Sequence, residues 1–218
     1  MNHLRLQLHV SFALVDDRAI FLDVRRDRYF ALDEAAAEAF ADLRADADCQ
    51  CSDERTETLL ATGLFARSPE PLRIRSATIG APERDLPDDG ARPALRDLIQ
   101  ILFLAVRYHR GVRQQPLETV IAKRRRTPAK TSKGPHAATL ALAQRFLRAR
   151  ALVPIKPVCL QDSLALHDWL AAHDAPSSLV LGVRLDPFAA HCWVQHGDIV
   201  LNDAADRVAP YTPILVVE

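Results

Sequence analysis

The sequence has few cysteines and no long hydrophobic run. Its four cysteines, in 218 residues, are too few and too unevenly placed for the disulfide framework of a secreted domain. No apolar stretch approaches the roughly 20 residues that a membrane-spanning helix needs. Charged residues at 16–18 also interrupt the region where a signal peptide would have its apolar core. We therefore expect a cytoplasmic protein that does not act at a membrane.

The sequence has no net charge either, because 28 basic residues balance 28 acidic ones. Its 49% hydrophobic and 26% charged residues are typical of a globular protein and exclude disorder, collagen and coiled coil. Residues 1–90 hold 11 basic and 18 acidic residues, a net −7, whereas residues 91–218 hold 17 and 10, a net +7. The sign changes within a stretch rich in proline and glycine. We therefore predict a first domain at 1–68, a linker at 69–92 and a second domain at 93–218.

The first domain begins with three short apolar runs separated by charged breaks, at 10–15, 19–24 and 28–32. Runs of this length joined by tight turns predict three antiparallel strands. Asp33 then stands at a helix N-cap position before an alanine-rich segment at 34–43. A second helix is expected at 53–62, ending at Gly63, which tolerates the left-handed cap conformation. The first domain is thus predicted to be α+β, a three-stranded sheet with helices.

A three-stranded sheet leaves the backbone groups along its outer strands unpaired. Such an edge, next to a helix, can accept an extended peptide as an additional strand. A domain that docks onto the C-terminal half of its own chain is an equally good interpretation of the composition. Nothing in this domain points to catalysis.

The end of the third predicted strand carries a family resemblance. The string Arg28-Tyr29-Phe30-Ala31-Leu32-Asp33, followed by an alanine-rich helix, resembles the PqqD-like leader-recognition domain of ribosomal peptide biosynthesis. This resemblance implies a winged-helix-like fold in which a leader peptide pairs with the third strand and lies against the last helix. The middle helix of larger family members is reduced here to 45–52. The leader-binding residues that the resemblance implies are Arg28, Tyr29, Phe30, Leu32, Arg55, Leu59 and Thr62.

The second domain opens with helical periodicity at 94–108, which returns at 137–151. Between these segments lies a basic run at 123–126, and further basic residues continue it to His136. A basic run can bind nucleic acid, but no aromatic residues interleave with it and no reading helix follows. We favour a solvated loop, with contact to an acidic partner as the next interpretation, and we do not expect nucleic acid as a partner.

Cys159 lies where a helix is expected to begin. Pro154 and Pro157 stop the preceding helix and keep the approach extended, and a long apolar-faced helix follows at 160–170. At a helix N-terminus the unpaired N–H groups and the positive end of the dipole stabilise a thiolate, which lowers the pKa of a thiol. Cys159 is therefore the candidate nucleophile, and chance placement in the core is the alternative.

Strand-like segments joined by hairpin turns follow this helix, at 178–184, 190–195 and 199–203. A thiolate nucleophile needs an imidazole within hydrogen-bond reach, and the imidazole needs a carboxylate or an amide that orients it. His191 on one strand and Asp203 on the neighbouring strand supply these groups. We therefore predict a catalytic triad of Cys159, His191 and Asp203.

Geometry removes the competing residues. Cys192 follows His191 on a strand and so points to the opposite face, which predicts a packed thiol. His167 lies about 12 Å along the helix from its first residue and does not reach the helix tip. Cys49 and Cys51 have no second ligand pair at a zinc spacing, so no metal site is expected.

The order of cysteine, histidine and aspartate, with a helix first and a sheet after it, resembles the transglutaminase-like branch of papain-fold enzymes. The strings around Cys159, around His191 and around Asp203 resemble the lasso peptide maturation proteases of the microcin J25-processing type. The separations of 32 and 12 residues between the three positions match the spacing in that family. The resemblance implies a transglutaminase-like, papain-like α+β domain with an antiparallel sheet.

This resemblance implies a leader peptidase. The first domain would hold the leader of a precursor peptide, and the triad would cleave the leader from the core. A partner lasso cyclase of the asparagine-synthetase type would then close the macrolactam. Family members consume ATP together with that cyclase, but this chain has only seven glycines and no phosphate-binding G-x-x-x-x-G-K-[ST] loop. We therefore expect no cofactor on this chain and any ATP on the partner.

The mechanism expected from the triad is attack by the Cys159 thiolate, with the backbone N–H of Cys159 as one oxyanion donor. Val183, Phe188 and Trp193 are candidate wall residues for the substrate. Two other functions remain open. A transglutaminase-like transferase would use the same triad but pass the acyl group to an amine, and a non-catalytic scaffold would only bind the peptide for the cyclase.

Overall fold

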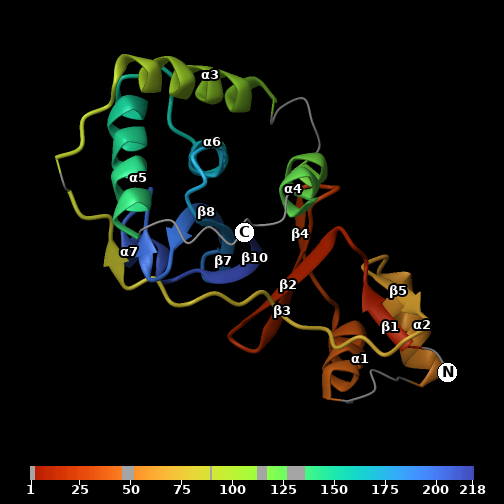
Figure 1. The fold of residues 1–218 in the computed structure, drawn as a ribbon. Helices are drawn as coiled ribbons and strands as arrows, with labels where there is room; N and C mark the ends of the chain where they lie inside the picture. Colours follow the sequence, from red (N-terminus) through yellow and green to blue (C-terminus); the bar gives the residue numbers. More distant parts are fainter. Residues whose placement is uncertain (1–2, 46–51, 89, 112–116, 127–135) are drawn as a thin grey trace. The chain divides into compact units, whose positions relative to one another are not determined.

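A computed structural model describes residues 3–45, 52–88, 90–111, 117–126 and 136–218. The chain divides into two compact units, Met1–Ala77 and Thr78–Glu218. Both units combine helices with antiparallel strands, in agreement with the predicted α+β class (Figure 1). The shortened middle helix expected at 45–52 falls almost wholly outside the described residues.

The first unit contains the predicted three-stranded antiparallel sheet, in the order β2-β3-β4. Its strands are β2 (Val10–Val15), β3 (Arg18–Asp23) and β4 (Arg28–Ala31). A second sheet, which the sequence analysis missed, pairs β1 (His3–Leu6) with β5 (Phe65–Ser68). β1 and β5 lie near opposite ends of the sequence of this unit, so no local pattern in the sequence indicates their pairing.

The helices of the first unit begin where the sequence predicts and end within two residues of the predicted positions. α1 (Glu34–Ala45) starts after Asp33, whose carboxylate accepts the N–H of Ala36 at 2.9 Å. α2 (Asp53–Ala61) is followed by Gly63, which takes the left-handed conformation with φ of 71°.

Four phenylalanines form the centre of the first unit. Phe12 and Phe21 come from the three-stranded sheet, Phe40 from α1 and Phe65 from β5, and neighbouring ring centroids lie 5.1–5.8 Å apart. All four rings are buried. This cluster joins both small sheets and α1 into one core.

The second unit is built on a five-stranded sheet in the order β10-β7-β8-β9-β6. Its strands are β6 (Arg84–Asp85), β7 (Ser178–Arg184), β8 (Ala189–His196), β9 (Ile199–Val200) and β10 (Thr212–Val217). The hairpins β7-β8 and β8-β9 confirm the predicted strand order, although β9 is shorter than the predicted strand at 199–203.

The segment at 69–92, predicted as a linker, is in part an integral element of the second unit. Within it β6 adds a parallel edge strand beside β9. Arg84 donates twice to the Asp198 carboxylate, at 2.6 and 2.7 Å, and Asp85 accepts the N–H of Ala205 at 2.6 Å. The boundary between the units therefore lies near residue 77, because the second half of the proline-rich stretch is paired and hydrogen-bonded.

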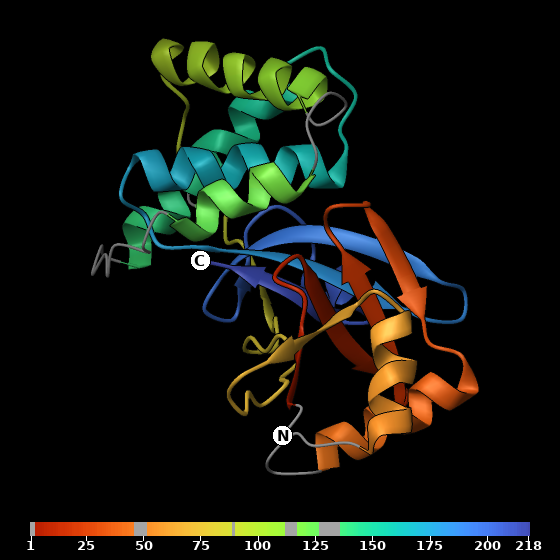
Figure 2. The ribbon, with the colours of Figure 1, turned by 90° about the vertical axis from the view of Figure 1, so that its right-hand side faces the viewer.

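The four longer helices of the second unit lie on one side of its sheet, as Figure 2 shows. They are α3 (Leu95–Gly111), α4 (Leu117–Arg126), α5 (His136–Ala151) and α6 (Cys159–Ala172), with the short α7 (Ala205–Val208) following β9. The helices predicted at 94–108, 137–151 and 160–170 are confirmed, whereas α4 and α7 were not predicted.

The basic run at 123–126 is not a loop, because it forms the last turn of α4. Arg124 is buried there and donates to Asp168 of α6 and to the hydroxyl of Tyr108 of α3, at 2.6 Å in both cases. The hydroxyl of Tyr108 also donates to Asp168. This cluster ties α3, α4 and α6 together, so at least one cation of the run has a structural role. The rest of the basic segment, 127–135, lies outside the described residues.

Candidate active site

Cys159 is the first residue of α6, and one buried arginine holds the backbone that leads to it. Arg150, near the end of α5, donates to the carbonyl oxygen of Ile155 at 3.0 Å and to Asp162 Oδ1 at 2.7 Å. Asp162 Oδ2 accepts the N–H of Val158 at 3.2 Å and so satisfies a backbone donor beside the helix start. These contacts fix the start of α6 and leave Cys159 exposed.

His191 is on β8, and its Nε2 lies 2.7 Å from Asp203 Oδ2. The two side chains are 19% and 14% exposed, so water only partly screens their interaction. Asp203 was predicted to lie on a strand, but β9 ends at Val200 and Asp203 lies in the bend that follows it. Its Oδ1 accepts the N–H of Ala204 at 2.8 Å, which orients the carboxylate. Since Nε2 faces Asp203, Nδ1 is the ring nitrogen left for the thiol.

The thiol of Cys159 and the imidazole of His191 stabilise each other's charged forms. The hydrogen bond with His191 is the main reason that the pKa of Cys159 lies below its usual value, and backbone N–H groups of Cys192 and Leu160 add to it. The pKa of His191 is raised, first by the same hydrogen bond and then by Asp203. Burial opposes both shifts but does not reverse them. The arrangement therefore favours a thiolate paired with an imidazolium.

Residues 102–216, more than half of the chain, match the family model described as the transglutaminase-like superfamily. The chain belongs to this superfamily. It is also similar to the microcin J25-processing protein McjB of Escherichia coli, with 45% identity over 49 residues. That match spans 22% of this chain and 24% of the relative. No solved structure matches the chain significantly.

In this transglutaminase-like protein a glycine makes room beside the imidazole. Gly182 of β7 pairs with His191, and a Cβ at Gly182 would lie 2.7 Å from the Trp193 ring and 2.9 Å from Tyr211 Cβ. The ring centroids of Tyr211 and Trp193 lie 5.3 and 6.2 Å from that of His191. His191 therefore lies close to two aromatic rings, and the sequence analysis missed both Gly182 and Tyr211 as parts of the site.

The expected substrate wall is only partly available to a substrate. Phe188 is 52% exposed, but Val183 and Trp193 are 0% and 1% exposed. Val183 is one residue from Gly182 on β7 and so faces away from His191. Trp193 packs in a cluster that includes Val208 of α7. Val183 and Trp193 are therefore core residues and do not form a substrate wall, contrary to the prediction.

The residues expected to bind a leader occupy β4 and α2 of the first unit. On β4, Arg28 is exposed, and Tyr29 and Phe30 are half-buried; Leu32, just past the strand, is half-buried too. The positions on α2 and its C-cap differ from one another. Arg55 is exposed and forms an ion pair with Asp42, Leu59 is fully buried in the core, and the Thr62 hydroxyl donates to the carbonyl of Leu59 at 2.6 Å. Leu59 is therefore corrected to a core residue, because it faces the sheet.

Two of the competing residues, Cys192 and His167, lie where the sequence predicts, whereas Cys49 and Cys51 lie outside the described residues. Cys192 is buried, and burial raises the pKa of its thiol far above that of Cys159. His167 is buried within α6, where burial and the charge of Arg124 lower its pKa to about 4. Neither is poised as a nucleophile or a base. The contribution of Cys192 is its backbone N–H, which no sequence pattern reveals because every residue except proline has one.

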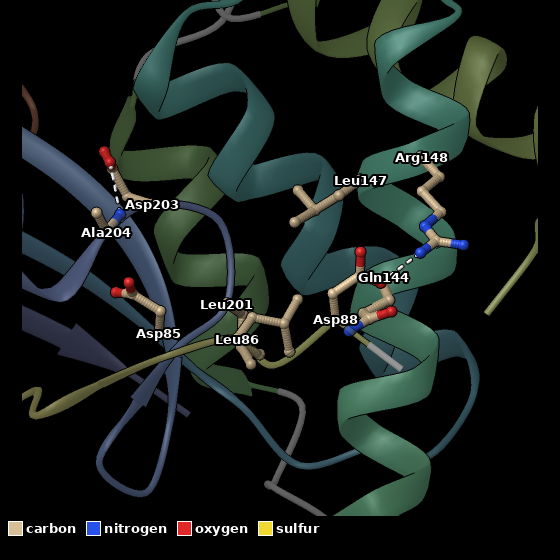
Figure 3. A pocket seen from close by; sticks show the side chains of 9 residues that line it. All are labelled: Asp85, Leu86, Asp88, Gln144, Leu147, Arg148, Leu201, Asp203 and Ala204. Atoms are coloured by element: carbon tan, nitrogen blue, oxygen red, sulfur yellow. Dashed lines mark hydrogen bonds and ion pairs between the residues drawn. The ribbon is translucent and has the colours of Figure 1, made fainter. Parts of the chain in front are cut away.

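A pocket of about 310 Å³ is lined by Asp203 together with residues of β6 and α5, as Figure 3 shows. Its apolar lining residues follow β6, lie on α5 or follow β9, and two other lining residues, Arg148 and Asp88, form an ion pair. Its lining residues are Asp85, Leu86, Asp88, Gln144, Leu147, Arg148, Leu201, Asp203 and Ala204.

Among the described residues, no group of three or more His, Cys, Asp or Glu side chains is arranged to hold a metal ion. Over the same part of the chain, no helix has the length and apolar character required to cross a membrane.

Proposed function

We propose that the chain is a cysteine peptidase that removes the leader from a ribosomally made lasso precursor peptide. The observation that carries the proposal is the hydrogen-bonded order Cys159, His191, Asp203, with the cysteine exposed at the tip of α6. The similarity to a microcin J25-processing protein supports the substrate class. The match to the transglutaminase-like superfamily supports acyl chemistry at the cysteine.

In the proposed mechanism the thiolate of Cys159 attacks the carbonyl carbon of the last leader residue. The backbone N–H of Cys159 stabilises the oxyanion, and the His191 imidazolium protonates the leaving amine of the core. The leader remains as a thioester on Cys159. His191 then takes a proton from water, which attacks the thioester and releases the leader as a free acid. Asp203 holds the imidazole in the orientation that both steps require.

The leader would bind the first unit through β4. Within the described residues β4 pairs only with β3, so the other edge of β4 is open to an extended peptide. Arg28, Tyr29, Phe30 and Leu32 would contact the leader beside this edge. Arg55 and Thr62 would contact it from α2 and its C-cap, without Leu59.

A lasso cyclase of the asparagine-synthetase type is the proposed partner. Cleavage exposes the amine of the core peptide, and macrolactam formation consumes that amine. ATP would activate the carboxylate on the cyclase, so this chain needs no nucleotide site of its own. Two other functions use the same features: an acyl transfer to an amine, and a non-catalytic scaffold that only presents the peptide.

The test uses the full-length protein with precursor peptide and cyclase, and mass spectrometry of the products. Cys159→Ala should abolish release of the leader while leaving precursor binding close to that of the wild type. Cys192→Ala is the matched control, since it removes a buried thiol and keeps the backbone N–H, and it should retain cleavage. Cleavage by Cys159→Ala at the wild-type rate would reject the peptidase proposal. A cross-linked product would support the transferase.

Leader recognition is tested separately, by fluorescence anisotropy with a labelled leader peptide. Arg28→Glu on β4 should weaken binding, whereas the same charge change at Arg18 on β3 should not. Equal affinities for the two variants and the wild type would remove β4 from the recognition surface.

A further inference from the structure

A buried serine of α6 is hydrogen-bonded to the strand that carries His191. Ser163 is 0% exposed, and its Oγ donates to the carbonyl oxygen of Cys192 at 2.9 Å. Ser163 lies one helical turn after Cys159, and Cys192 directly follows His191 on β8. This single bond therefore joins the helix that carries the thiol to the strand that carries the imidazole.

Asn202 connects the third element to the same serine. Its Nδ2 donates to Ser163 Oγ at 2.8 Å, and its Oδ1 accepts the N–H of Val194 at 2.7 Å. The N–H of Leu201 donates to the carbonyl oxygen of Val194 at 2.8 Å, so the backbone and the amide of Asn202 together bind both backbone groups of this β8 residue. Asp203 follows immediately. The position of its carboxylate is thus tied to both α6 and β8.

The chemistry of this bridge is specific to the two side chains. The hydroxyl of Ser163 both donates and accepts, and the amide of Asn202 does the same. A carboxylate at position 202 would accept the Val194 N–H but would have no proton for Ser163 Oγ. An alanine at position 163 would leave a buried carbonyl and an amide without their partner.

We propose that Ser163 and Asn202 are positioning residues, which hold Cys159, His191 and Asp203 in the register that forms the thiolate–imidazolium pair. This inference rests on the proposed function for its meaning, but its test does not need the substrate. Each partner in the bridge is adjacent to, or one helical turn from, one member of the triad. Loosening the bridge lets the helix tip shift relative to the imidazole, so the thiolate loses its main stabilising contact.

The experiment measures the rate of Cys159 alkylation by iodoacetamide as a function of pH, with peptide mapping to separate Cys159 from the other cysteines. Ser163→Ala, Asn202→Ala and Asn202→Asp should shift the profile to higher pH and lower the rate at pH 6 by roughly tenfold. Ser163→Thr retains the hydroxyl and should restore much of the rate. The double variant of Ser163→Ala and Asn202→Ala should match the larger single effect, because both changes break one bridge.

Ser177→Ala is the matched control. Ser177 Oγ lies 3.2 Å from Nδ1 of His167 in the same unit, at the far end of α6, so its loss should lower the melting temperature without moving the Cys159 profile. Wild-type alkylation profiles for Ser163→Ala and Asn202→Ala would overturn the inference, whatever their melting temperatures. If Ser163→Ala does not fold, the alkylation profiles of Asn202→Ala and Asn202→Asp decide, because Asn202 is only half-buried.

Leader cleavage by the same variants separates this inference from the proposed function. Suppose that Cys159→Ala loses cleavage, whereas Ser163→Ala keeps cleavage and has the wild-type alkylation profile. This result rejects the positioning role and leaves the peptidase proposal intact. Cleavage kept in Cys159→Ala rejects the peptidase, and the alkylation profiles still decide whether the bridge positions the thiol.

Discussion

Replacing Asp203 tests how much the carboxylate contributes to the imidazole. The bond from His191 Nε2 to Asp203 Oδ2 is 2.7 Å long and only partly exposed, and a hydrogen bond to a charged group contributes roughly 1.5–3 kcal/mol. If about 2 kcal/mol of this acts on the imidazolium in the transition state, Asp203→Ala should lower the cleavage rate about thirtyfold. Asp203→Asn keeps one acceptor oxygen in place of the two that bind His191 and Ala204, and its NH2 group cannot accept, so it should also lower the rate.

Removing Asp203 should also change the pKa values of His191 and Cys159, in directions that the structure predicts. Asp203 is one of the groups that raise the pKa of His191, so its removal should lower that pKa. The imidazolium is then lost at a lower pH, and the thiol of Cys159 should ionise at a higher pH than in the wild type. Iodoacetamide alkylation against pH measures this shift, and leader cleavage measures the rate. Wild-type values in both assays for Asp203→Ala would refute the orienting role.

Three further changes test the surroundings of the site. Gly182→Ala places a Cβ against the Trp193 ring and should cost roughly 1–3 kcal/mol in urea unfolding. Arg124→Met leaves the Asp168 carboxylate without its cation and should cost about 3 kcal/mol in the same assay. His167 has a pKa of about 4 in the fold, so protons bind the unfolded chain more readily and stability should fall from pH 6.5 towards 4. His167→Gln should flatten that slope.

Local patterns in the sequence predicted most of the regular structure. Alternating apolar runs separated by charged turns indicated the hairpins of both units, and the capping residue Asp33 marked the start of α1. The helix tip at Cys159 follows from two prolines before an apolar-faced segment. The order of this helix and the hairpins after it was enough to group Cys159 with His191 and Asp203.

The failures share a cause, which is dependence on contacts between distant segments. The pairing of β1 with β5 and of β6 with β9 joins residues that are far apart in the chain. A short stretch of sequence therefore cannot predict these pairs. Val183 was misassigned because the side of β7 that faces His191 depends on the register, which pairs Gly182 with His191. Trp193 does lie on the His191 side, but the unpredicted α7 helps to cover it.

The fate of the leader carboxyl group in isotopically labelled water tests most directly whether the thioester on Cys159 is hydrolysed. Wild-type protein, precursor and cyclase are incubated together, and the released leader is analysed by mass spectrometry. A cysteine peptidase should release a leader whose new C-terminal carboxylate carries oxygen from the labelled water, and Cys159→Ala should give no such product. A leader joined to an amine, or labelled leader formed by Cys159→Ala at the wild-type rate, would contradict the peptidase proposal.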